Sequence, residues 1–386
     1  MKTKSDKQAT LCVHAGVEPD ATHQSIMTPI FQTSTYVQDF PGQPKTHDYG
    51  RAGNPTRDAL EQSLAALEGA SYGISLASGL AAVQAVAQLL RPGSHVLVCD
   101  DVYGGSGRLF RTLFAHYDIE FEFVDMTVSA DAFQGYLKPN TQMVWLETPT
   151  NPLLKIIDIA AVAAAAHAAG ALVVVDNTFA SPIFQSPLAL GADIAMHSVT
   201  KYIGGHSDII GGALMLNDEQ LHEKLRFIQF AAGAISAPMD CFLLLRSIKT
   251  LALRMQAHQH NAQCFAEALG SMPGISEVIY PGLTNHPQYQ LARQQMRGFS
   301  GMVSVRMDGD FQQVARFMQA LNLFSLAESL GGVESLVNHP ETMTHASVPQ
   351  ELRNKLGISS NLLRFSVGIE DVDDLIADVK QALLQG

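Results

Sequence analysis

The chain has 386 residues, of which 47% are hydrophobic, enough for a large packed core and for two or three domains. Its 37 acidic residues outnumber 25 basic ones, for a formal net charge of -12, and the basic residues are too scattered to form a face for nucleic acid. Four widely spaced cysteines, a polar start without a secretory leader and no apolar run of roughly 20 residues argue against disulfides, a zinc cage and a membrane helix, so a reducing cytoplasm is the expected location.

The first part of the chain, residues 1–58, is expected to be an extended arm. It holds few periodic apolar residues but many Pro, Thr, Gln and Gly, as in Thr28-Pro29-Ile30 and in the segment 51–55. An arm of this kind must lie on another surface.

From about residue 59, helices alternate with short buried strands. The pattern predicts helices at 58–68, 79–90, 106–116 and 158–169, and strands at 73–77, 95–99, 120–124, 143–147, 171–175 and 193–197. Such alternation indicates an α/β fold with a mostly parallel central sheet covered by helices, in a domain that we expect to span residues 59–244.

The helix at 158–169 has well-defined ends. Asp158 can cap its first turn and Gly170 supplies a left-handed stop, so the strand at 171–175 begins almost at once. This brings Asp176 to the carboxyl end of a parallel strand, where ligands gather in open α/β sheets.

The last third of the chain has a different texture. A helical region at about 218–270 is followed by strands near 275–279, 301–306 and 362–367 and by helices at 310–321 and 371–384. We expect a smaller α+β domain, residues 245–386.

Lys201 and Asp176 are the most informative pair of residues. Lys201 follows Ser198 and Thr200, just after a predicted buried strand, where an unpaired ammonium would be costly. An amine that can form an imine, hydroxyls that can donate to a phosphate and a carboxylate that keeps a pyridine nitrogen protonated are the groups that pyridoxal phosphate needs. The alternatives are a surface lysine and an aspartate that caps a turn.

A possible phosphate site lies at Ser78-Gly79-Leu80, between a short strand and an Ala-rich helix. The amides of Gly79 and Leu80 would be free donors at the positive end of that helix. A strand-to-helix turn containing glycine can also be purely structural.

Two further residues are candidates for ligand contacts. Tyr103 follows the strand at 95–99, so it can stack on a cofactor ring or be buried with a structural hydrogen bond. Arg364 puts a charge in the middle of an apolar strand, which requires a carboxylate, either that of an amino-acid substrate or that of an internal salt bridge.

These residues belong to motifs that resemble those of the pyridoxal-phosphate enzymes of Cys/Met metabolism. The motifs are Tyr49 and Arg51 before Gly-Asn-Pro-Thr at 53–56, Glu-Thr-Pro-Thr-Asn-Pro at 147–152, Asp-Asn-Thr-Phe at 176–179, Ser-Val-Thr-Lys-Tyr at 198–202 and Leu-Ala-Glu-Ser-Leu-Gly-Gly at 326–332. The likeness covers about residues 10–384, and several motifs are too long and ordered for a chance match.

The resemblance implies fold type I of the pyridoxal-phosphate enzymes, the aspartate aminotransferase-like fold, and a homotetramer built from two catalytic dimers. Lys201 would hold the cofactor aldehyde and shuttle protons, and Tyr103 would stack on the ring. The other implied cofactor-binding residues are Asp176, Thr178, Gly79, Leu80, Ser198 and Thr200, with Tyr49 and Arg51 reaching across from the neighbouring subunit. The implied substrate-binding residues are Asn151, Glu328, Ser329 and Arg364.

The members of this family share the cofactor and differ in reaction. Methionine γ-lyases usually carry a cysteine where Gly105 stands here, which lowers that option, and Glu328 resembles the acidic residue of enzymes that act at the γ-carbon. Residues 278–283 and 343–347 are similar to γ-lyases, whereas His47-Asp48-Tyr49 resembles bacterial γ-synthases. The expectation is a lyase that cleaves cystathionine to cysteine, 2-oxobutyrate and ammonia; cystathionine γ-synthase, which joins an O-acylhomoserine to cysteine, is the first alternative and cystathionine β-lyase the second.

Other classes of protein fit the sequence less well. A nicotinamide dehydrogenase would also use a parallel sheet, but no GxGxxG follows an early strand. A noncatalytic protein of this fold would be expected to have lost its lysine, aspartate or arginine, and all three are present. His14, His197 and His206 lack a ligand-spaced carboxylate or thiol cluster, so no metal site is expected.

Overall fold

Two β-sheets organise the chain in the computed structural model, which describes residues 7–385. The larger sheet has seven strands in the order β1-β7-β6-β5-β4-β2-β3. They are β1 (Tyr72–Leu76), β2 (His95–Cys99), β3 (Glu120–Val124), β4 (Thr141–Glu147), β5 (Leu172–Asp176), β6 (Ile194–His197) and β7 (Gly212–Leu216). Within the described residues β7 alone runs opposite to the other six strands of this sheet, so the prediction of a mostly parallel sheet is confirmed.

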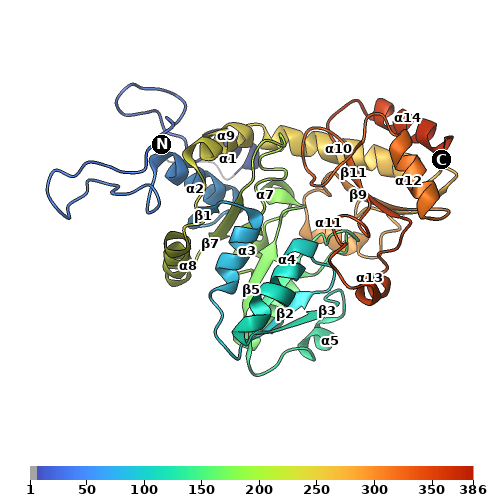
Figure 1. Cartoon of the computed structure of the whole chain (residues 1–386), viewed down its shortest axis with the longest axis horizontal. Helices are drawn as coiled ribbons and strands as arrows, with labels where there is room; N and C mark the ends of the chain where they lie inside the picture. Colours follow the sequence, from blue (N-terminus) through green and yellow to red (C-terminus); the bar gives the residue numbers. More distant parts are fainter. Residues whose placement is uncertain (1–6, 386) are drawn as a thin grey trace.

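Helices cover both faces of this sheet (Figure 1). They are α2 (Pro55–Glu68), α3 (Gly79–Ala87), α4 (Gly104–Arg108), α5 (Ala130–Gln134), α6 (Ile159–Ala168), α7 (Ser181–Phe184), α8 (Glu219–Ala232) and α9 (Pro238–Ile248). One apolar core contains residues of α3 and α6, and a second contains residues of α2 and α9. Because both faces are covered, β5 reads as a continuous apolar run, and Val173, Val174 and Val175 are fully buried.

The smaller sheet has the order β10-β11-β12-β9-β8. Its strands are β8 (Ile275–Ile279), β9 (Met302–Met307), β10 (Ser325–Leu326), β11 (Leu336–Asn338) and β12 (Leu362–Ser366). The helices of this region are α10 (Leu251–Leu269), α11 (Tyr289–Gln295), α12 (Phe311–Ala320), α13 (Gln350–Leu356) and α14 (Val372–Leu383). The long helix α10 extends from beside α9 into the region of the smaller sheet (Figure 1). The predicted α+β texture is confirmed, while the domain boundaries at 58/59 and 244/245 stay predictions.

The N-terminal segment projects from the body as an irregular loop (Figure 1), but it also contains a helix, α1 (Gln8–His14), that was not predicted. Leu11 and Cys12 of α1 are buried in the core beside α2. The expected arm is therefore anchored at one end; its residues 1–6 lie outside the described part of the chain.

One predicted helix is wrong in its bounds and form. In place of a helix at 106–116, α4 is followed by a π turn (Leu109–Leu113) and a 3-10 turn (Phe114–Tyr117). Three of the five residues of α4 are glycine, which has low helix propensity, so the segment lacks a strong preference for one continuous helix.

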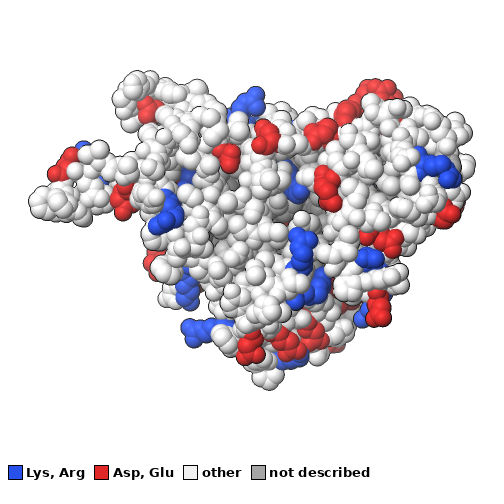
Figure 2. Space-filling model, viewed as in Figure 1, with Lys and Arg blue, Asp and Glu red and all other residues white. Residues whose placement is uncertain are grey.

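Charge is mixed over the surface: Figure 2 shows Lys and Arg interspersed with Asp and Glu on the face in view. None of the helices within residues 7–385 combines the length and the apolarity that crossing a membrane requires.

Candidate active site

A cavity of about 760 Å³ lies where the parallel strands of the larger sheet end, and the smaller sheet closes one side of it. The larger sheet contributes residues that follow or end β1, β2, β4, β5 and β6, namely Ser78, Tyr103, Asn151, Asp176 and Ser198. The region of the smaller sheet contributes Glu328, Ser329 and Arg364. The cavity thus forms at the sheet edge where the sequence predicts a ligand.

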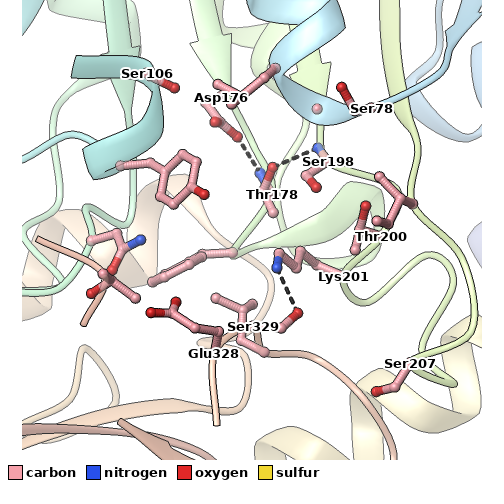
Figure 3. Close-up of a pocket in the computed structure, with 18 of the residues that line it drawn as sticks. Ser78, Ser106, Asp176, Thr178, Ser198, Thr200, Lys201, Ser207, Glu328 and Ser329 are labelled. Atoms are coloured by element: carbon pink, nitrogen blue, oxygen red, sulfur yellow. Dashed lines mark hydrogen bonds between the residues drawn. The ribbon is translucent and has the colours of Figure 1, made fainter. Parts of the chain in front are cut away.

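Lys201 points into this cavity, where its Nζ donates a hydrogen bond to Ser329 Oγ at 2.6 Å (Figure 3). Burial, and then the charge of Arg364, lower the pKa of Lys201 to about 8, against a smaller opposing effect of Glu328. Ser329 has a φ of 85°, a left-handed conformation that costs a non-glycine residue on the order of 1–3 kcal/mol. The alternative of a surface lysine is wrong.

Asp176 ends β5 with only 6% of its surface exposed. Its Oδ1 accepts a hydrogen bond from the Thr178 amide at 3.0 Å. Thr178 Oγ1 in turn accepts from the Ser198 amide at 2.9 Å (Figure 3). Burial raises the pKa of Asp176, against smaller opposing effects of its hydrogen bonds with Thr178, so a cation in the cavity beside this carboxylate would stabilise the ionised form. The aspartate both holds a turn and lines the cavity.

The turn before α3 forms a cradle of backbone amides. Ser78 Oγ accepts from the Ala81 amide at 3.0 Å, which leaves the amides of Gly79 and Leu80 without a partner in the described chain. A Cβ atom on Gly79 would lie 2.9 Å from Ser198 Cβ, so only glycine allows this close approach. This arrangement fits an anion such as a phosphate.

Thr200 also lines the cavity, but its hydroxyl is already engaged. Oγ1 accepts from the Gly211 amide at 3.0 Å and donates to the Gly211 carbonyl at 3.2 Å. A phosphate contact through this hydroxyl would require it to leave the carbonyl.

Arg364 is 2% exposed in the middle of β12. Its NH1 donates to Asn151 Oδ1 at 2.7 Å and its NH2 to the Ser329 carbonyl at 3.0 Å, whereas its buried Nε has no partner. No carboxylate of residues 7–385 lies within ion-pair distance, so the alternative of an internal salt bridge is wrong for the described chain. Burial lowers the Arg364 pKa to about 10, and the site favours an incoming carboxylate.

Tyr103 is 39% exposed, and its hydroxyl makes no hydrogen bond within residues 7–385. Its backbone amide donates to Glu147 Oε2 at 2.8 Å. The ring is therefore not fixed by a structural hydrogen bond, and it remains available for stacking.

Glu147 is a cavity residue that was not assigned a role from the sequence. It ends β4 directly beside Asp176, which ends β5, and its pKa is raised well above the ordinary value by burial and then by the Asp176 charge. The available signal was its place at the end of a predicted strand, the same signal that identified Asp176.

Tyr49 and Arg51 do not line the cavity of their own chain. Tyr49 is 44% exposed, and the Arg51 guanidinium lies 5.3 Å from its ring centre and 5.0 Å from that of Phe230.

In the part of the chain that the structure describes, one group of side chains has metal-ligand types close together: His95, Glu120 and Glu122. The Lys138 ammonium lies 2.8 Å from Glu120 Oε1 and 2.7 Å from Glu122 Oε2. An ammonium already balances these carboxylates, and we assign no metal.

Groups that line the cavity match the parts of pyridoxal phosphate. An amine of lowered pKa suits its aldehyde, a buried carboxylate suits its pyridinium nitrogen, and the amides before α3 suit its phosphate. Together with the seven-stranded sheet, these groups define a fold type I pyridoxal-phosphate enzyme.

Comparison with known proteins identifies the family. The family model described as Cys/Met metabolism PLP-dependent enzyme matches residues 9–384, and the chain belongs to this family. It is 50% identical over 378 residues to a cystathionine gamma-lyase of Dictyostelium discoideum, covering 98% of this chain and 97% of the relative. It is 47% identical over 374 residues to a cystathionine beta-lyase of Lactococcus lactis, covering 97% of this chain and 98% of that relative. A crystal structure of a cystathionine gamma synthase from Xanthomonas oryzae, in complex with aminoacrylate and cysteine, superposes with a TM-score of 0.94 at 43% identity and 98% coverage of both chains.

Proposed function

We propose that the chain is a cystathionine γ-lyase, which cleaves cystathionine to cysteine, 2-oxobutyrate and ammonia. The observation that carries this proposal is the position of Glu328, whose carboxylate faces the same cavity as Lys201 (Figure 3). Tyr103 also lines this cavity. Its negative charge acts on Lys201, Tyr103 and Arg364. A carboxylate here can attract the distal ammonium of cystathionine and assist proton transfer near the γ-carbon.

Residues on several sides of the cavity would hold the cofactor. Lys201 would carry its aldehyde, Asp176 would face its ring nitrogen and Tyr103 would stack on its ring. Gly79, Leu80, Ser198 and, once its hydroxyl leaves the Gly211 carbonyl, Thr200 would bind the phosphate, while Thr178 keeps Asp176 and Ser198 in place. When bound, the cofactor acts as an electron sink that stabilises negative charge at the substrate α-carbon.

The chain's own residues then handle the substrate and its protons. Arg364 and Asn151, with Ser329, receive the substrate carboxylate, which supplies the partner that Arg364 Nε lacks. Lys201 Nζ accepts the α-proton as a neutral amine, a state favoured by burial and by the Arg364 charge. Ser329 Oγ, which accepts from Nζ at 2.6 Å, orients that amine.

A γ-synthase is the second candidate, because His47 and Asp48 precede Tyr49 as in bacterial γ-synthases and the solved γ-synthase shares 43% of its sequence with this chain. Such an enzyme would use the same residues to join an O-acylhomoserine to cysteine. A β-lyase is the third candidate, supported by 47% identity to the enzyme of Lactococcus lactis.

We also propose a homotetramer made of two catalytic dimers, in which Tyr49 and Arg51 complete the neighbour's phosphate site. The separation of both residues from the cavity of their own chain supports this arrangement.

The reaction products test the proposal. Purified protein incubated with cystathionine is expected to release cysteine and 2-oxobutyrate, identified by mass spectrometry. Glu328→Gln should lower kcat/KM by roughly tenfold or more, whereas Glu334→Gln, at a cavity residue bonded to Ser207 instead, should have a smaller effect. Pyruvate with homocysteine would establish a β-lyase, and turnover of O-succinylhomoserine with cysteine but not of cystathionine would establish a synthase.

A further inference from the structure

A buried polar network lies behind the cavity, on the opposite side of the sheet edge from Asp176. Successive residues of a strand point to opposite faces, so Asn177 and His197 face α2 while Asp176 and Met196 line the cavity. Glu68, the last residue of α2, is 2% exposed and meets both. Its Oε1 accepts from Asn177 Nδ2 at 3.0 Å and, over a short distance, from His197 Nε2.

The network continues from Asn177 to Gln185, which is fully buried. Gln185 Nε2 donates to Asn177 Oδ1 at 2.9 Å and to the Thr148 carbonyl at 2.8 Å. Its Oε1 accepts from Gln295 Nε2 of α11 at 3.0 Å. Helices α2 and α11 are thereby tied to the ends of three strands.

The network holds the ends of three strands, and each of these ends has a site residue close to it in the sequence. Asn177 stands between Asp176 and Thr178, and His197 immediately precedes Ser198. Thr148 follows β4 and begins the loop that reaches Asn151. The site side chains face the cavity while their neighbours anchor the backbone from behind.

We propose that Glu68, His197, Asn177 and Gln185 form a positioning network that sets where Asp176, Ser198 and Asn151 stand around the cofactor. A core built only to be stable would favour apolar side chains here, because a buried carboxylate is costly and Glu68 Oε2 has no partner. A connected polar network instead fixes one arrangement of the three strand ends.

The test uses the holoenzyme loaded with pyridoxal phosphate labelled with ¹⁵N in its ring. Glu68→Gln replaces charge-assisted hydrogen bonds by weaker neutral ones and puts a donor where Oε2 has no acceptor. Glu61→Gln is the matched control, since Glu61 is buried in the same helix but is bonded to Arg226 and does not line the cavity.

We expect Glu68→Gln to move the ring-nitrogen resonance toward that of an unprotonated pyridine and to weaken cofactor affinity by roughly tenfold, the scale on which outer partners tune bound groups. The kcat of Glu68→Gln should fall by a larger factor than its KM changes. Gln185→Leu should shift the nitrogen resonance and weaken cofactor affinity in the same direction. His197→Gln keeps a donor near the position of Nε2, so its nitrogen resonance and cofactor affinity should stay close to those of the parent.

The proposal fails if Glu68→Gln and Gln185→Leu lower only the melting temperature, as Glu61→Gln can, and leave the nitrogen resonance and the cofactor affinity unchanged. If Glu68→Gln does not fold, the comparison of Gln185→Leu with Glu61→Gln decides. These readouts concern the cofactor and do not depend on which sulfur amino acid is the substrate.

Discussion

At the scale of single residues, Lys201 combines a lowered pKa, which favours its reactive neutral amine, with a fixed position in the cavity. Burial and the charge of Arg364 favour the neutral amine of Lys201, and the hydrogen bond to Ser329 Oγ directs it. Glu328 opposes the shift, because a nearby negative charge favours the ammonium. The reactivity of the amine at neutral pH therefore depends first on its burial and then on the balance between Arg364 and Glu328.

This balance gives a pH dependence for the cofactor-free protein. Only the neutral amine attacks an aldehyde, so the rate of covalent cofactor capture should rise as the pH increases through about 8, the lowered pKa of Lys201. Glu328→Gln removes a charge that raises this pKa, so it should move the midpoint to lower pH. Stopped-flow absorbance across a pH series measures both midpoints. A midpoint near the ordinary value of 10.5, or an upward shift in Glu328→Gln, would contradict the assignment.

At the scale of elements, the end of β1 and the start of α3 form the phosphate cradle. Residue 79 must be glycine, because a Cβ atom there would lie only 2.9 Å from Ser198 Cβ. Ser198 follows β6. The close approach joins two strand ends that are far apart in the sequence.

Gly79→Ala tests this cradle. Overpacking typically costs about 1–3 kcal/mol, so the dissociation constant of the cofactor should rise by roughly five- to 150-fold. Gly270→Ala is a suitable control, because its Cβ would meet its nearest neighbour, Glu267 O, at an ordinary 3.5 Å. Absorbance titration of the cofactor-free variants gives both constants, and equal affinities for the two variants would argue against a phosphate at α3.

The sequence predicts elements well where local signals agree. Asp158 caps α6 through the Ala161 amide at 2.9 Å, and Gly170 has a φ of 77°, as expected. The strand β7 was missed because a five-residue apolar run bounded by glycine has no periodicity that separates a strand from a helix. Its antiparallel direction depends on its pairing with β1 and β6 and not on its own residues.

The residues of the candidate site also divide into those that the sequence predicts and those that it does not. Lys201, Asp176 and Arg364 were found because a charge in the middle of an apolar strand, at its end or shortly after it has a local cost that the sequence makes visible. The network of Glu68 and Gln185 was not found, because its members are joined only when α2, α7 and three strand ends meet.

At the scale of the whole molecule, the N-terminal segment presents apolar side chains to solvent. Ile26, Val37 and Phe40 are 83%, 89% and 62% exposed. Exposed apolar surface of this kind indicates a surface that binds a partner. A second copy of the chain as that partner is consistent with the proposal that Tyr49 and Arg51 complete a neighbour's site.

Subunit mixing tests that proposal. Arg51→Ala and Lys201→Ala should each be nearly inactive alone. In a mixed dimer, the site with an intact Lys201 receives an intact Arg51 from its partner, so random mixing should restore about a quarter of the parent activity. Activity after joint refolding measures the recovery. If the mixture stays as inactive as its parts, Arg51 acts within its own subunit or not at all.

The central claim is that Lys201 carries the cofactor, and reduction with borohydride followed by peptide mapping tests it most directly. The reagent fixes the bond between an amine and the cofactor aldehyde, and mass spectrometry locates it. We predict the added mass on the peptide that contains Lys201, and its loss in Lys201→Ala. Attachment to a different lysine, or a reduced protein with no added mass, would contradict the account.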